Sequence, residues 1–102
     1  MAKSRLELHE ILCDILGSRN VYFQPPESLK MKYPCIVYER SGIDEIFADN
    51  SEYRNLKRYT ITYIDEDPDS ETPDKLQAVR YCYFDTHFKA DNLNHDVFTL
   101  YF

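Results

Sequence analysis

Four acidic residues at alternating positions are the first group of side chains in this sequence with the spacing of a chemical site. They are Asp65, Asp67, Asp69 and Glu71. Calcium-binding loops place oxygen ligands at alternate residues in this way, but they also need a glycine for the sharp turn and a closing bidentate glutamate. Ser70 and Leu76 stand at those two positions. The sequence therefore predicts a strand end and a helix N-terminus rich in carboxylates rather than a calcium site.

Two histidines and an aspartate recur at intervals of four residues: His87, Asp91 and His95. On a helix this spacing would align three metal ligands on one face. The surrounding residues alternate as in a β-hairpin, where the same spacing does not bring side chains together. We therefore predict no metal and no other cofactor in this part of the chain, and assign Asp91 and its neighbours to a turn.

Three cysteines, Cys13, Cys35 and Cys82, are an odd number at wide spacing, which predicts buried free thiols. No flanking motif marks a Cys–His pair as a nucleophile and its base. The two glycines, Gly17 and Gly42, are too few for a loop that cradles phosphates. We predict no catalytic residues and expect that the protein is not an enzyme.

Two helices are expected among the elements that position these residues. Ser4 and Glu7 fit a capping box, apolar residues recur at helical spacing from Leu8 to Leu16, and Gly17 supplies a left-handed stop. A second, short helix is expected to have Thr72 as its N-cap.

Alternating and β-branched segments predict strands at 21–23, 35–40, 55–65, 82–89 and 97–102, with a turn at 91–94 between the last two. In the strand at 82–89 we expect Cys82, Phe84, Thr86 and Phe88 on one face. Residues 43–50 fit neither a helix nor an alternating strand, and we expect an extended arm or edge strand there. The fold class predicted is α+β: one domain over 1–102, with an antiparallel or mixed sheet packed with an N-terminal helix and a second short helix.

The charge balance excludes one broad class of function. The 102 residues carry 12 Lys and Arg against 18 Asp and Glu, a net charge of −6. Proteins that grip nucleic-acid phosphates concentrate positive charge instead. No apolar stretch approaches the ~20 residues of a membrane span, and the N-terminal residues do not form a signal peptide. We expect no membrane partner and a chain made and used in a cytosol.

Nine tyrosines and six phenylalanines are more than a single small core easily encloses. Tyrosine is enriched at protein interfaces, so some of these rings are candidates for contacts between subunits or with partners. The alternative is that they cover the outer face of the sheet in cross-strand pairs. The candidate contact residues are Ile43, Ile46, Phe47, Tyr53, Tyr101 and Phe102.

Most of the chain resembles a known family. The runs RYTITYIDEDPDSETPDKL (58–76), CYFDTHFKADNLNHDVFTLYF (82–102) and YPCIVYE (33–39), with ADN (48–50), resemble small proteins encoded among the head and tail genes of siphophages and prophages of Firmicutes. The resemblance is to tail terminator, or tail completion, proteins, and the first helix is generic.

The resemblance implies a virion structural protein, assembled in the host cytoplasm, that forms a hexameric ring on the tail tube. Such a ring stops tube polymerisation and meets the head-completion protein, and DNA passes through it without specific binding. If acidic residues line the lumen, they repel DNA phosphates. The candidates for that lining are Asp44, Glu45, Asp49, Asp65, Asp67 and Asp69.

Two other functions stay open from the sequence. A head-completion, or stopper, protein on the other side of the same joint has a similar size. A small metal-binding hydrolase would use Asp65, Asp67, His87 or His95.

Overall fold

The computed structural model describes residues 4–44 and 56–102. Two helices and five strands follow one another in the order α1 (Arg5–Leu16), β1 (Val21–Phe23), β2 (Cys35–Asp44), β3 (Leu56–Asp65), α2 (Thr72–Gln77), β4 (Cys82–Ala90) and β5 (Leu93–Tyr101). The predicted α+β class is confirmed, with an N-terminal helix, a second short helix and a mixed sheet.

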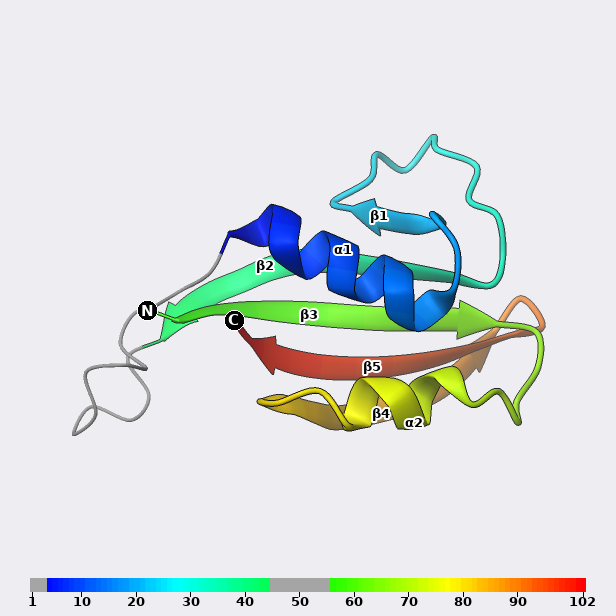
Figure 1. Ribbon diagram of the computed structural model, residues 1–102. Helices are drawn as coiled ribbons and strands as arrows, with labels where there is room; N and C mark the ends of the chain where they lie inside the picture. Colours follow the sequence, from blue (N-terminus) through cyan, green and yellow to red (C-terminus); the bar gives the residue numbers. More distant parts are fainter. Residues whose placement is uncertain (1–3, 45–55) are drawn as a thin grey trace.

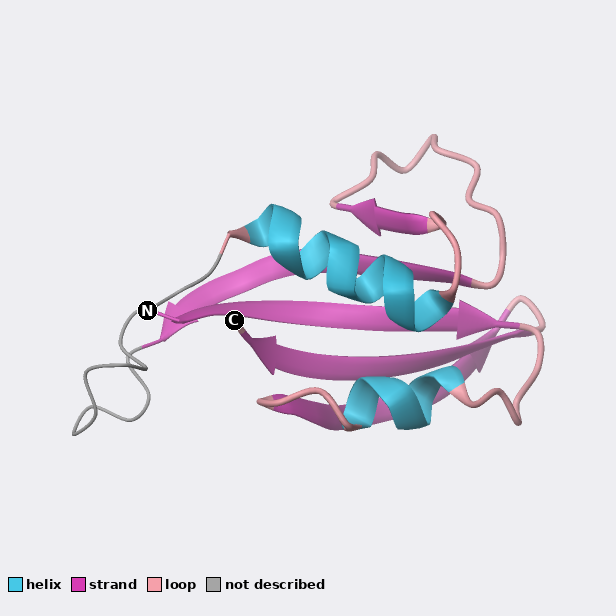
Figure 2. Cartoon of the chain, in the orientation of Figure 1, coloured by secondary structure: helices cyan, strands magenta, loops and turns pink. Residues whose placement is uncertain are grey.

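The strands form one sheet in the order β1-β2-β3-β5-β4. The β1 and β2 strands are parallel, and every other neighbouring pair is antiparallel. Both helices cover the same face of this sheet, α1 over its β1–β3 half and α2 close to β4 (Figures 1 and 2). We call this covered side the helix face and the other side the open face.

Local signals at both ends explain where α1 begins and ends. The Ser4 hydroxyl accepts a hydrogen bond from the Glu7 N–H, and the Gly17 N–H donates to the Cys13 carbonyl at 2.8 Å. Gly17 has φ of +81°, a conformation that glycine adopts without strain. The helix buries Leu8, Leu12 and Cys13, whereas Ile11, which we expected on the apolar stripe, is 36% exposed.

Aromatic and branched residues on the helix face form the core. Opposite residues of paired strands share a face, which places Ile36 beside Tyr63 and Ile61 between Tyr38 and Phe98. All five are buried, and the helices add Leu8, Leu12 and Cys13 of α1 and Leu76 of α2 to the same cluster.

A hydrogen-bonded network surrounds the hydroxyl of Tyr38, whose side chain is fully buried. Arg5 donates to the Tyr38 oxygen at 3.1 Å, and His9 Nδ1 lies 2.7 Å from it. Burial, followed by the positive charge of Arg5, lowers the pKa of His9. The lowered pKa favours the neutral imidazole, which shares a hydrogen bond with the Tyr38 hydroxyl through Nδ1.

Three boundaries differ from the sequence predictions. The strand expected at 35–40 continues to Asp44 after an irregularity between Arg40 and Gly42, so Ile43 and Asp44 extend β2 and pair with β3. Because β1 pairs only with 36–38, no described strand lies on their other side, and the rest of the arm or edge strand expected at 43–50 lies outside the described residues. Thr72 is the first residue of α2 rather than its N-cap, which is Glu71. The last strand begins at Leu93 because Asp91 and Asn92, both with positive φ, complete the turn in two residues.

A bulge in β4 overturns the predicted alternation of that strand. Phe84 lies opposite Phe98, but Thr86 lies opposite Val97, so Asp85 is an extra residue. Residues after the bulge therefore change sides. Phe84 is on the helix face, whereas Thr86 and Phe88 are on the open face.

Candidate interaction surface

The β4 strand is one edge of the sheet and is exposed along nearly its whole length. Eight of its nine residues, all except Cys82, are exposed. The sheet order ends at β4, so the backbone groups on its outer side have no strand neighbour in the described part of the chain. A long edge of this kind is available for pairing with another strand.

Three large aromatic side chains stand on this edge: Tyr83 is 52% exposed, Phe84 47% and Phe88 46%. Large apolar side chains gathered on one exposed element are typical of contact surfaces. We call β4 and the β5 side chains that touch its aromatic rings the β4 surface.

On the open face, each aromatic ring of β4 contacts a ring of β5. Tyr83 meets Tyr101 edge to face with ring centroids 6.3 Å apart, and Phe88 stacks on His95 at 4.6 Å and 12° between the planes. Such cross-strand pairs hold the rings in place before any partner binds. The open face of the hairpin therefore carries two ordered aromatic pairs.

On the helix face, Phe84 packs edge to face against buried Phe98, with centroids 5.6 Å apart. His87 Nδ1 lies 2.7 Å from an Asp96 carboxylate oxygen, with 45% of the His87 side chain exposed. The β4 surface thus has an apolar end near Phe84 and a polar centre on this side.

The contact residues expected from the sequence are only partly placed. Tyr101 belongs to the β4 surface, and Phe102 packs partly buried against the core while its backbone pairs with Lys57. Ile43 lies in β2 opposite Lys57. The other three, Ile46, Phe47 and Tyr53, lie outside the described residues.

Sequence reasoning missed Tyr83, Phe84 and Phe88 as contact candidates. The sequence does contain a signal for their exposure, because Tyr83 has an odd number and Phe84 and Phe88 have even numbers. No single face of a regular strand can bury rings at both parities.

The acidic segment after β3 uses its carboxylates to hold its own turn. Asp65 accepts hydrogen bonds from the Tyr63 hydroxyl and, at 3.1 Å, from the Asp67 N–H. Asp67 in turn accepts from the Asp69 N–H at 2.9 Å. Buried Asn94 closes the segment by donating to the Asp65 and Glu66 carbonyls.

The remaining acidic candidates for a lumen lie elsewhere in the chain. Asp44 ends β2 opposite Leu56. Glu45 and Asp49 lie outside the described residues.

The residues considered for metal binding are not brought together. His95 lies opposite Phe88 on the open face, while His87 lies opposite Asp96 on the helix face, so the two imidazoles cannot share an ion. His95 Nδ1 instead lies 3.1 Å from the Leu93 carbonyl. Within 4–44 and 56–102, no group of three or more His, Cys, Asp or Glu side chains has the arrangement of a metal site.

All three cysteines are buried free thiols, as predicted. Burial raises the pKa of Cys82 to about 11, and burial together with the negative charge of Asp65 raises that of Cys35 to about 11. Burial also raises the pKa of Cys13. Because the thiolate is the reactive form, these environments suppress nucleophilic chemistry.

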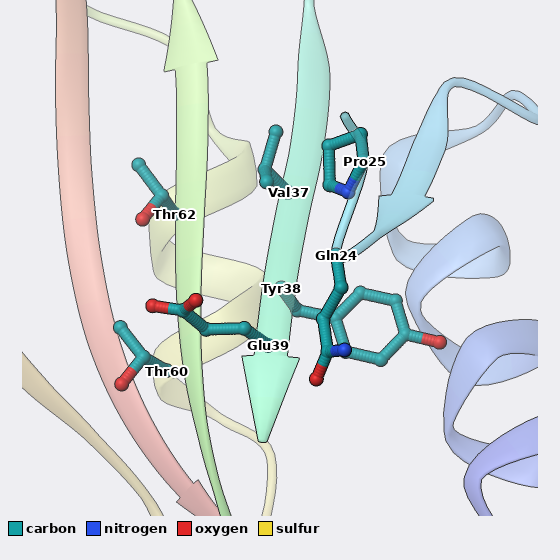
Figure 3. A pocket seen from close by; sticks show the side chains of 7 residues that line it. All are labelled: Gln24, Pro25, Val37, Tyr38, Glu39, Thr60 and Thr62. Carbon is teal, nitrogen blue, oxygen red and sulfur yellow. The ribbon is translucent and has the colours of Figure 1, made fainter. Parts of the chain in front are cut away.

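A shallow hollow of about 210 Å³ lies beside β2 and β3, bordered by the chain that follows β1 (Figure 3). Val37 lies opposite Thr62, and Glu39 opposite Thr60, on the open face. Gln24, Pro25 and Tyr38 complete the lining. The lining contains hydroxyl groups and one carboxylate but no histidine or cysteine, so it lacks the usual pair of an activated nucleophile and its base.

No protein-family model, curated protein or solved structure matches this chain. In the described residues, neither helix has the length and apolar character needed to span a membrane.

Proposed function

We propose that this chain is a structural subunit of a phage or prophage tail, a terminator that forms a ring on the tail tube. The ring stops tube polymerisation and provides the joint to the head-completion protein. The observation that carries this proposal is the resemblance of 33–39, 58–76 and 82–102 to tail terminator proteins. Those segments form β2, β3, α2 and the β4–β5 hairpin, so the resemblance spans most of one folded unit.

The surface chemistry supports an assembly role. Aromatic residues that could stabilise a core lie instead on an exposed strand. Contact of their apolar surface with water is unfavourable unless a partner covers it. The cysteines are protonated and buried, and the two hairpin histidines lie on opposite faces. These features favour a binding surface over the metal-dependent hydrolase that the sequence left open.

The acidic segment fits passage of DNA through such a ring. Asp67 and Asp69 are exposed, and their charges, repeated in each subunit, would repel phosphates that come near. A ring structure tests this placement. If 65–69 lies on the outer rim, the proposed repulsion is wrong even if the ring exists.

The function is tested by deleting the gene from a phage or prophage that carries it and measuring tail-tube length by electron microscopy. A terminator predicts tubes of uncontrolled length, and expression of the intact chain from a plasmid should restore normal tubes. Tubes of normal length that fail to join heads would overturn the terminator proposal and indicate a stopper on the head side. Normal virions would contradict both.

A further inference from the structure

The two edges of the sheet differ greatly in length. In the described residues, the β1 edge has three residues and the β4 edge has nine. The loop after β1 also folds back beside it, since the Lys32 N–H donates to the Tyr22 hydroxyl. A three-residue edge cannot pair with all of β4. The edge on a second copy that matches β4 in length is β4 itself.

We propose that two free subunits pair antiparallel through β4, with Tyr83 of each opposite the partner's Phe88. The occupant of the β4 surface is thus a second copy of this chain. This contact is isologous and closes at two copies, so it does not build a six-fold ring. It concerns the subunit before assembly and goes beyond the proposed function.

The bulge at Asp85 selects the register. When two strands continue one sheet, opposite residues must point to the same face. The bulge moves Phe84 to the helix face and Phe88 to the open face, so these two cannot stand opposite each other across the pair. Placing Tyr83 opposite the partner's Phe88 matches the open faces, and placing Phe84 opposite the partner's His87 matches the helix faces.

This register also uses most of the strand. Residues 82–89 of each copy are paired, and the two bulges meet at the two-fold axis. If the partner strand is shifted by two residues so that Tyr83 lies opposite the partner's Thr86, the faces also match, but only residues 82–87 of each copy are paired. A shift by two in the other direction brings Thr86 opposite the partner's His87, which lie on different faces.

The pairing joins the aromatic contacts of the two subunits into one row. On the open face, Tyr101 contacts Tyr83, Tyr83 lies opposite the partner's Phe88, and Phe88 of each copy stacks on His95. Tyr83, Phe84 and Phe88 are each about half exposed, so the two subunits together bring at most roughly 450–750 Å² of aromatic surface to the contact. Stable interfaces bury about 1,200–2,000 Å² in total, so the rings supply about a third of that area, and the paired backbones and the other side chains of β4 add to it.

The stoichiometry of the purified full chain tests the proposal. Sedimentation over a range of protein concentrations should show a monomer–dimer equilibrium. Phe88→Lys and Tyr83→Lys should each raise the dimer Kd at least about tenfold, because each removes an aromatic ring from the contact and adds a charged group that loses water when the two strands pair. Leu6→Lys is the matched control, since Leu6 is 65% exposed on α1, and it should leave the Kd unchanged.

Several outcomes would overturn the dimer. They are a monomer at every concentration at which the protein stays in solution, a dimer that withstands both lysine variants, or a dimer that Leu6→Lys weakens equally. If the chain stays monomeric, the partner of β4 would have to be a different protein. Circular dichroism confirms that each variant is folded before its Kd is compared.

Cross-linking tests the register separately. A Tyr83→Cys chain mixed with a Phe88→Cys chain should form a disulfide-linked dimer with oxidised glutathione, because directly opposite residues have Cα atoms about 4.5–5.5 Å apart. Each variant alone and the wild type, whose thiols are buried, should stay unlinked. More efficient linking of Tyr83→Cys to Thr86→Cys would overturn this register. Both measurements use free protein, so either result is independent of tube length in the deletion experiment.

Discussion

The two halves of the sheet use the same kinds of side chain in opposite ways. Under α1, Tyr38 and Tyr59 are almost completely buried, whereas Tyr83 and Phe88 of the hairpin are about half exposed. The difference follows from the face of the sheet, because Tyr38 and Tyr59 lie on the helix face under α1, whereas Tyr83 and Phe88 lie on the open face, which neither described helix covers. Aromatic content alone therefore does not define a core. The area that a helix covers decides which rings stabilise the fold and which remain free for contacts.

The largest effect on stability is expected when a buried ring under α1 is removed. Tyr38→Ala should lower the free energy of unfolding by about 3–5 kcal/mol, because it leaves a cavity between Phe23 and Tyr59 and removes the partner of Arg5 and His9. Urea denaturation measures this loss. Equal losses for Tyr38→Ala and Tyr83→Ala, compared as monomers, would contradict the distinction between the two halves.

A smaller effect is expected at the residue that ties the hairpin to the acidic segment. Asn94→Asp keeps the size of the side chain but removes the donor to the Asp65 and Glu66 carbonyls. The free energy of unfolding should fall by about 1–3 kcal/mol. Asn92→Asp, in the exposed turn two residues away, is the control in the same denaturation experiment and should cost less.

Acid should lower the free energy of unfolding through His9 of α1. The pKa of His9 is lowered in the folded state from its ordinary value of 6.5, so the unfolded chain binds the proton more readily. The stabilisation is complete above pH 6.5 and is lost as the pH falls toward the lowered value. His9→Gln removes this contribution, so the stability difference between wild type and His9→Gln should shrink from pH 7.5 to pH 5.5, as measured by urea denaturation at each pH. A constant difference would show that His9 is not the group responsible.

The smallest effect on folding is expected on the β4 surface. Phe88→Ser loses only its cross-strand contact with His95, worth about 0.2–1 kcal/mol. The measurement is made on the monomer, at a protein concentration below the dimer Kd. A loss as large as that of Tyr38→Ala would mean that Phe88 belongs to the core and not to a contact surface.

The parts of the fold that the sequence predicted are those set by short-range signals. Ser4 and Gly17 act within one turn of α1, and the alternation of Tyr59, Ile61 and Tyr63 requires only a regular strand. Burial of the three cysteines also follows from residue type.

The parts that the sequence did not predict depend on irregular pairing. The extra residue at Asp85 is defined by the register against β5, and no residue in β4 marks it by type. Without the bulge, Phe88 is expected on the same face as Phe84. Simple alternation assigns the faces of β4 wrongly, and the contact candidates that the sequence predicts lie at 43–53 and 101–102 rather than in β4.

The two-residue turn at Asp91 and Asn92 has a consequence for the order in which the chain folds. It brings Ala90 opposite Leu93, so the hairpin closes through local contacts and should form within about 1–10 μs. Pairing of β3 with β5 joins residues such as Asp65 and Asn94, far apart in sequence, and is slower because a longer loop must close. The β4 edge is therefore present and uncovered before the core is complete. We expect refolding yield to fall as protein concentration rises, and to fall less in chains whose edge carries a lysine.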